Sequence, residues 1–98
     1  MVEYETLYLR VTKEEAARRI SERVEHVACA DEGGVIDYRT NVGVHLATLS
    51  DVTLESGEPG TKLRYRTSVI RPHLFHARNE ARQIRDAVER YRTSERER

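Results

Sequence analysis

The chain has 98 residues, of which 38% are hydrophobic and 35% are charged, and its formal net charge at pH 7 is zero. This balance excludes a disordered chain and is typical of one small globular domain with a thin core and a heavily charged surface. No apolar run approaches the roughly 20 residues that cross a bilayer, and the N-terminal residues lack the basic and apolar segments of a signal peptide, so we expect a cytoplasmic protein.

The first two predicted elements are a strand and a helix. Apolar and polar residues alternate over residues 3–11, which predicts a strand with one buried face. Thr12 precedes Glu15 by three positions, the capping-box pattern of a helix start. The helix is expected over residues 13–24, with a buried stripe of Ala16, Ala17, Ile20 and Val24. Its solvent side offers ion pairs such as Glu14 with Arg18 and Glu15 with Arg19.

A hairpin is predicted next. Residues 26–30 and 35–40 have strand character, and the segment 31–34 between them ends in two glycines, a strong turn signal. The single cysteine, Cys29, lies in the first of these strands and excludes an internal disulfide. We expect its side chain to be buried in the sheet.

Two longer strands follow. Every even position from Val42 to Leu54 is apolar or small, which predicts that the even residues face the core. Thirteen extended residues are longer than an ordinary strand, so a bend is expected at Gly43 or near Asp51. After a Gly- and Pro-containing loop at 56–60, residues 61–71 form the next strand. Its inward face is predicted to be Leu63, Tyr65, Thr67 and Val69.

The C-terminal third is predicted to be one amphipathic helix over residues 72–91, opened by Pro72. Apolar residues recur in it at intervals of three and four, at Leu74, Ala77, Ala81, Ile84, Val88 and Tyr91. The predicted fold is therefore α+β: a curved antiparallel sheet, in the order strand, helix, four strands, helix, packed on a long C-terminal helix. We expect one domain over residues 1–92 and a frayed charged tail at 93–98.

A family resemblance rests on the segment 60–66, Gly-Thr-Lys-Leu-Arg-Tyr-Arg, followed by a proline and a long amphipathic helix. This order resembles the second half of the START-like helix-grip superfamily. The resemblance implies a curved sheet that grips the C-terminal helix and an apolar ligand held in the space between them.

The residues themselves leave two interpretations of that space open. If the helix stripe faces the sheet, the inward polar residues could orient a ligand in an apolar pocket; these are Tyr38, Thr48, Ser50, Tyr65 and Thr67. Alternatively, the hydroxyls bond to the backbone or reach the rim, and the interior is a packed core. No catalytic motif accompanies these residues, so the pattern favours a binding module without catalysis.

The sequence contains candidates for two further kinds of site, a metal site and a nucleic-acid surface. His73 and His76 are spaced i,i+3 but lack a third ligand by spacing, so no metal or other cofactor is predicted. The chain is also asymmetric in charge, with minus six over residues 1–60 and plus six over 61–98. The C-terminal arginines Arg78, Arg82, Arg85 and Arg92 would suit a nucleic-acid accessory protein. Acidic residues at helical spacing can pair with them, however, and nucleic acid is not favoured.

The last expectation is a homodimer. The outward face of the long strand reads Gly43, His45, Ala47 and Leu49, which is only mildly polar for a solvent face. A shared surface would also stabilise a thin core. The first functional hypothesis is therefore a small module that binds an apolar molecule, and the second is a homo-oligomeric structural or regulatory protein without a pocket.

Overall fold

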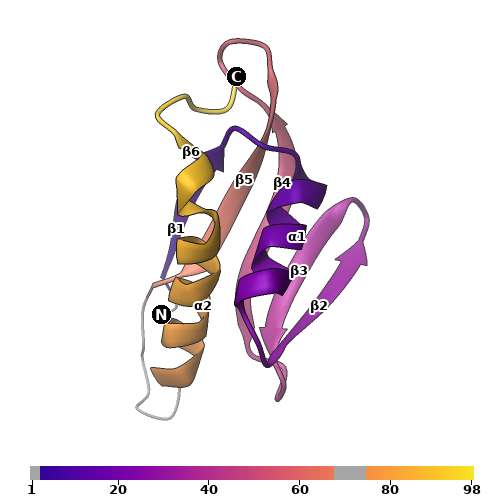
Figure 1. The fold of residues 1–98 in the computed structure, drawn as a ribbon, viewed down its shortest axis with the longest axis vertical. Coiled ribbons are helices and arrows are strands. Elements are labelled where there is room, and N and C mark those ends of the chain that lie inside the picture. The colour runs from indigo at the N-terminus through magenta and orange to yellow at the C-terminus, as the bar shows by residue number, and fades with distance from the viewer. Residues whose placement is uncertain (1–2, 68–74) are drawn as a thin grey trace.

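The computed structural model describes residues 3–67 and 75–98, without the side chains of the first two residues of the last helix. It is an α+β fold in which two helices cover one face of a six-stranded antiparallel sheet (Figure 1). Along the sheet the strands follow the order β2-β3-β4-β5-β1-β6. The elements in chain order are β1 (Tyr4–Leu9), α1 (Lys13–Arg23), β2 (Val27–Glu32), β3 (Val35–Thr40), β4 (His45–Thr53), β5 (Pro59–Arg66), α2 (Phe75–Val88), the 3-10 turn η2 (Glu89–Tyr91) and β6 (Arg92–Thr93).

Local signals in the sequence explain where α1 and the first hairpin form. The Thr12 hydroxyl accepts a hydrogen bond from the Glu15 backbone N–H at the start of α1, which confirms the predicted cap. Gly33 and Gly34 join β2 to β3 with φ of 61° and 80°, a conformation that favours glycine at both central positions of a tight hairpin turn. The predicted helix and hairpin are therefore both present.

The ion pairs on α1 differ from the predicted ones. Arg18 pairs with Glu15 and with Glu22, one turn away on either side. Arg19 instead donates from Nε to the Ala87 carbonyl of α2, at 3.1 Å. The expected pairs of Glu14 with Arg18 and Glu15 with Arg19 were wrong, because Arg18 pairs with Glu15 and Glu22 and Arg19 bridges the two helices.

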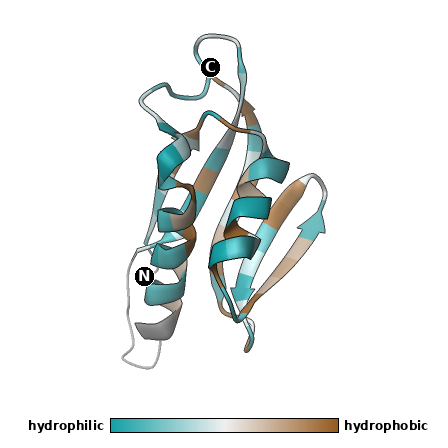
Figure 2. Ribbon diagram, viewed as in Figure 1, coloured by the Kyte–Doolittle hydropathy of each residue, from teal (hydrophilic) through white to brown (hydrophobic). Residues whose placement is uncertain are grey.

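The core lies between the helices and one face of the sheet. Ala16 and Ile20 of α1 are fully buried, as are Ala81, Ile84 and Val88 of α2. The apolar positions shown in brown in Figure 2 include the strand residues beneath them. On the sheet side the buried apolar residues are Leu7, Leu9, Ile36, Tyr38, Leu46, Ala47, Leu49, Leu63 and Tyr65. The stripe predicted on α2 is thus confirmed for its described members, with Tyr91 partly buried at the edge of the core.

The predicted inward face of the long strand is buried at Leu46 and Leu54 but was wrong between them, because β4 contains a bulge. Tyr38 pairs with Ala47, whereas the next residue, Arg39, pairs with His45, so Leu46 is the extra residue on β4. A shift of one residue moves every following side chain to the other face. The odd residues Ala47 and Leu49 therefore face the helices and are fully buried.

The observed path of β4 also contradicts two other expectations. Val42 lies in the turn before β4 and is 87% exposed, so it is not an inward residue. Ala47 and Leu49 belong to the core, so they do not supply the outward apolar surface on which the expected dimer was based.

Cys29 is exposed, contrary to the prediction that it is buried. It lies on β2, the strand at one edge of the sheet, and five of the six residues of β2 are exposed. Figure 1 shows why: the β2–β3 hairpin extends beyond α1, so α1 covers little of its outer strand. The apolar composition of this strand could not reveal that the helix stops short of it.

The C-terminal helix ends earlier than predicted. Over the described residues α2 covers Phe75–Val88 and is followed by the 3-10 turn η2, whereas the expected helix continued to residue 91. The expected start at Pro72 and the residues His73 and Leu74 lie outside the described residues. Within the parts of the chain that the structure describes, no helix combines the length and apolar character needed to cross a membrane.

The charged tail, predicted to be frayed, bonds to the β4–β5 turn in the structure. Arg92 and Thr93 form β6 beside β1, and Glu97 makes an isolated bridge with Leu54. The Arg98 N–H donates to the Thr53 carbonyl at 2.8 Å. Leu54 is fully buried at this point, and it packs on Gly60, where a Cβ atom would lie 2.8 Å from Leu54 Cγ.

Candidate functional site

The five candidate ligand residues do not line one space. Tyr38 and Tyr65 face the helices and are 3% and 4% exposed. Thr48 and Ser50 lie opposite Arg64 and Lys62 of β5, on the face of the sheet that the helices leave uncovered. Thr67 follows β5, and its N–H donates to the Glu3 carbonyl at 3.0 Å. The bulge at Leu46 separates the two tyrosines from the two hydroxyl residues of β4.

The space between α2 and the sheet is occupied by side chains. Ile84 and Val88 of α2 and Leu49 and Leu63 of the sheet are all fully buried. Tyr65 lies at the edge of this layer, and its hydroxyl donates to Glu5 Oε2 at 2.9 Å. Burial, together with the nearby Glu5 carboxylate, raises the Tyr65 pKa, although the Arg85 guanidinium acts in the other direction. This tyrosine therefore anchors β1 and β5 at the edge of the core.

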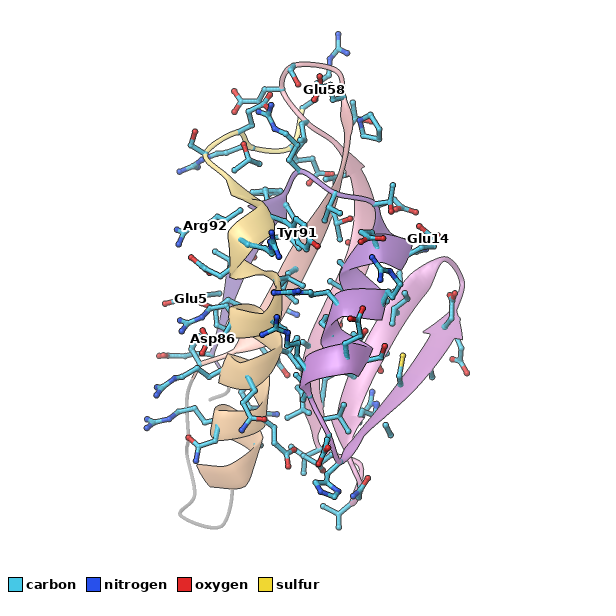
Figure 3. All side chains as sticks on the ribbon, in the orientation of Figure 1. Glu5, Glu14, Glu58, Asp86, Tyr91 and Arg92 are labelled. Atoms are coloured by element: carbon cyan, nitrogen blue, oxygen red, sulfur yellow. The ribbon has the colours of Figure 1, made fainter. Side chains whose placement is uncertain are left out.

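A groove lies instead between α1 and the β2–β3 hairpin. It has a volume of about 500 Å³ and an open mouth. Glu14, labelled in Figure 3, and Arg18 are the charged residues along it. Its remaining lining residues are apolar or weakly polar: Ala17, Ile20, Ser21, Val24, Val27, Cys29 and Tyr38.

Tyr38 and Cys29 give this groove its polar chemistry. The two residues are paired across the β2–β3 ladder on the helix-facing side. Burial, with a smaller contribution from Cys29, raises the Tyr38 pKa well above its ordinary value. Like an ordinary tyrosine hydroxyl, the Tyr38 hydroxyl is neutral at physiological pH and can donate a hydrogen bond.

The position of α1 over this groove is fixed by Lys13. This lysine is only 5% exposed, and its ammonium group lies 3.3 Å from Asp51 Oδ2 and donates to the Gly34 carbonyl in the hairpin turn. The first turn of α1 is thereby connected to β4 and to the tip of the hairpin. The groove thus has a defined shape although its outer wall is an edge strand.

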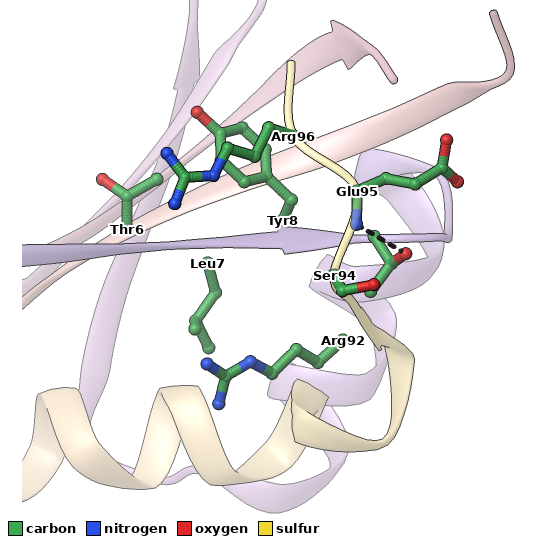
Figure 4. A pocket seen from close by; sticks show the side chains of 8 residues that line it. Thr6, Leu7, Tyr8, Arg92, Ser94, Glu95 and Arg96 are labelled. Atoms are coloured by element: carbon green, nitrogen blue, oxygen red, sulfur yellow. Dashed lines mark hydrogen bonds between the residues drawn. The ribbon is translucent and has the colours of Figure 1, made fainter. Parts of the chain in front are cut away.

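A second hollow, of about 620 Å³, lies at the free edge of β1 (Figure 4). Tyr8 and Arg96 lie on one side of β1, and Leu7 and Arg92 lie on the other. Two of the three charged residues that line it are paired: Arg92 donates to Glu89, and Glu95 pairs with Arg10. Hydrogen bonds from Ser56, with the nearby Arg10 charge, lower the Glu95 pKa although partial desolvation opposes them. This hollow has the character of a solvated seam between β1 and the tail.

The uncovered face of the sheet carries a chain of hydrogen-bonding side chains. The Tyr4 hydroxyl lies 2.9 Å from His45 Nδ1, and His45 Nε2 lies 2.7 Å from Asp37 Oδ1. Thr48 Oγ1 bonds to both His45 and Asp37, at 2.8 and 3.2 Å. Arg39 Nε donates to the other Asp37 oxygen at 2.9 Å. The chain runs across β3, β4 and β1.

The electrostatics of this network favour an ionised Asp37. Partial burial by itself raises the Asp37 pKa, but the His45 charge and the hydrogen bonds from Arg39 and His45 together bring the pKa below its ordinary value. A Tyr-His-Asp sequence of hydrogen bonds can orient the imidazole and move a proton along it. The primary sequence gave little signal for this site, because Tyr4 is 41 residues from His45.

Among the described residues, no group of three or more His, Cys, Asp or Glu side chains is arranged to hold a metal ion. His73 and the side chain of His76, considered as a metal pair, lie outside what the structure describes. On the C-terminal helix and its extension, Arg85 pairs with Asp86 at 2.7 Å and Arg92 with Glu89 at 3.1 Å. Part of the C-terminal arginine charge is therefore met by neighbouring carboxylates.

Comparison with known proteins gives no match. No family model matches the chain, and neither a curated protein nor a solved structure does. The groove, the edge strand and the polar network are therefore the features that bear on function.

Proposed function

We propose that the protein is a small-molecule binding module whose ligand lies in the groove between α1 and the β2–β3 hairpin. The ligand class is a compact apolar molecule with one hydrogen-bond acceptor. The function and the role of Tyr38 are those expected from the sequence, but the proposed ligand lies beside α1 and not between the sheet and α2. An antiparallel sheet packed against a C-terminal helix supports a helix-grip-like assignment, which is part of the same proposal.

The observation that carries the proposal is an apolar groove with a neutral hydroxyl in it. A volume of about 500 Å³ lies within the range of ordinary small-molecule sites, about 300–1,000 Å³. Ile20, Val24 and Val27 supply apolar surface for the body of the ligand. Tyr38, whose pKa is raised by burial, supplies a donor for a ligand carbonyl or ether oxygen.

The test uses two tryptophan substitutions on one strand. Cys29 lines the groove, whereas its neighbour Ala28 points to the opposite face of β2. Cys29→Trp should fill the groove and weaken binding of the neutral probe 2-naphthyl methyl ketone, which carries one acceptor, by about tenfold or more. Ala28→Trp adds the same side chain outside the groove and should leave binding unchanged. The measurement is an NMR shift titration, with perturbations expected on α1 and β2.

Two results would contradict the proposal. One is the absence of saturable binding by the wild-type protein, and the other is equal weakening by both tryptophan variants. A Tyr38→Phe variant adds a check on the hydroxyl, because it keeps the ring and removes only the donor. We expect it to weaken an acceptor-bearing ligand such as 2-naphthyl methyl ketone but not naphthalene itself.

The β2 edge supports a second function, assembly of a homodimer. Residues 27–30 of β2 read Val-Ala-Cys-Ala, yet three of these four residues are exposed and the outer edge of the strand pairs with no described strand. Such an edge is a template for antiparallel pairing with another chain. The structural or regulatory role expected for a homo-oligomer would then use β2 as its interface.

Sedimentation at micromolar concentration tests this second function. The wild-type chain should sediment as a dimer, and the double variant Ala28→Lys/Ala30→Lys should sediment as a monomer, because lysine on an edge strand opposes edge-to-edge pairing. A control with lysine at Thr53, exposed at the end of β4, should remain dimeric. A monomeric wild-type protein would contradict the dimer.

A further inference from the structure

Arg66 is a charged side chain with an unusual environment. It is only 7% exposed, and its Nε donates to the His45 carbonyl at 2.9 Å. Its NH1 nitrogen is shielded from solvent and has no hydrogen-bond partner among the described residues. A buried guanidinium nitrogen that lacks an acceptor is destabilising, so the Arg66 NH1 is a place where a ligand could supply the missing acceptor.

Arg64 lies next to it on the same face of β5. The two arginines are two positions apart on the strand, so their side chains lie on the same side of the sheet. Both guanidiniums lie over the Tyr4 ring: the Arg64 Cζ is 4.3 Å and the Arg66 Cζ is 5.6 Å from the ring centroid. The aromatic ring holds the two positive charges near one another.

No acidic side chain neutralises this pair within residues 3–67 and 75–98. The carboxylate of the neighbouring polar network, Asp37, is already bound to Arg39 and His45. Arg64 and Arg66 form no ion pair in the described part of the chain. Two guanidinium charges therefore lie over the Tyr4 ring without an ion-pair partner among the described residues.

We propose that Arg64, Arg66 and Tyr4 form a binding site for a phosphate group. A phosphate monoester carries about −1.5 to −2 charge and three acceptor oxygens, which matches two guanidinium charges and their in-plane N–H donors. The Arg66 NH1 supplies the donor that lacks a partner, and the ligand must displace the groups that now shield it. The exposed Arg64 provides the first contact for an arriving anion.

The Tyr4–His45–Asp37 chain has a positioning role in this site. The hydrogen bond between the Tyr4 hydroxyl and His45 Nδ1 orients the ring on which both arginines lie. His45 is held in turn by Asp37 and Thr48. The site lies on the face of the sheet opposite to the α1 groove, so it is independent of the function proposed above.

The experiment measures binding of inorganic phosphate by NMR shift titration at constant ionic strength, with chloride as the reference anion. Arg66→Met keeps an apolar stem and removes the charge, and Arg66→Lys keeps the charge but loses the planar donors. Either variant should weaken phosphate binding by about tenfold. Lys62→Gln is the matched control, because Lys62 lies on the same strand and face, two residues from Arg64.

The outcomes separate specific binding from general charge attraction. The proposal is supported if phosphate shifts the signals of Tyr4, Arg64 and Arg66 and if Lys62→Gln binds within twofold of wild type. It is overturned if no saturable shift occurs up to tens of millimolar phosphate, or if Lys62→Gln weakens binding as much as the Arg66 variants do. Only variants whose spectra show the native fold are compared. If Arg66→Met does not fold, Arg66→Lys alone provides the test of Arg66.

Two further titrations distinguish the source of the phosphate group. Glycerol 3-phosphate represents a soluble ester, and vesicles of phosphatidylcholine with phosphatidic acid represent a lipid headgroup. Stronger binding of the soluble ester than of inorganic phosphate would support a metabolite. Vesicle binding that requires both phosphatidic acid and Arg66 would support a lipid headgroup as the ligand. Vesicle binding that the Arg66 variants leave unchanged would show that this site does not bind the lipid.

Discussion

The residues of β4 that face the core can be tested by substitution. Leu49 and Ser50 are neighbours, but the bulge at Leu46 directs Leu49 to the core and Ser50 to the uncovered face. Leu49 is 0% exposed. The even-inward pattern in the sequence would reverse the two roles. Alanine substitutions at the two positions therefore test the register directly.

The expected magnitude follows from the burial of Leu49. Truncation to alanine removes three carbons, which costs about 2.4 kcal/mol of transfer free energy at about 0.8 kcal/mol per methylene. The cavity left in a closely packed interior raises the loss to about 3–4 kcal/mol. Ser50→Ala should change the free energy of unfolding by no more than about 0.5 kcal/mol, because no core contact is lost. The total stability of such a domain is about 5–15 kcal/mol, so Leu49→Ala should still fold.

Urea unfolding followed by circular dichroism measures both values. With an m-value of about 1–3 kcal/mol per M, Leu49→Ala should lower the unfolding midpoint by more than 1 M. The midpoint of Ser50→Ala should lie close to that of the wild-type protein. Equal losses, or a larger loss at Ser50, would show that the register is not the one described and would refute the reasoning from the bulge.

Two other predictions concern the sheet. Gly60→Ala should lower the free energy of unfolding by about 1–3 kcal/mol, because its Cβ would lie 2.8 Å from Leu54 Cγ and 2.9 Å from the Leu9 carbonyl oxygen. In a Leu54→Ala background the loss, measured by thermal unfolding, should be smaller but still present. Strictly additive losses would contradict this packing. Asp37→Asn should lower the free energy of unfolding by about 1 kcal/mol at pH 6. The Asp37 pKa is lowered in the folded protein, so its ionised carboxylate stabilises the fold at pH values above the ordinary aspartate pKa near 4. This difference from wild type should disappear as pH falls through the folded-state pKa, and a difference that persists at pH 2 would show that the Asp37 charge is not its cause.

Local signals in the sequence were sufficient for most of the elements. The Thr12 cap needs only one side chain and a backbone N–H three residues away, and the Gly33-Gly34 turn needs only the conformational freedom of two residues. Such interactions form between neighbours, so they can be recognised without the fold. The α+β class and the strand order along the chain followed from them.

The candidate site could be predicted only in part. Tyr38 was identified from its periodicity, and the structure places it in the α1 groove. Cys29 was expected to be buried, and its exposure depends on how far α1 extends over β2. The alternation over residues 61–71 placed Arg66 on the outer face of its strand. The contacts of Arg66 with Tyr4 and His45 could not be predicted, because they depend on pairing between strands that are distant in the chain.

The sequence by itself determined the hydrophobic stripes, the turns and the helix start, because each depends on spacing along the chain. Tertiary structure alone decided which face of β4 is buried. The alternating pattern from Val42 to Leu54 has two possible faces, and one extra residue at Leu46 selects the other one. That choice rests on Tyr38 and Leu63 packing against β4 from both sides, a contact that no local pattern contains.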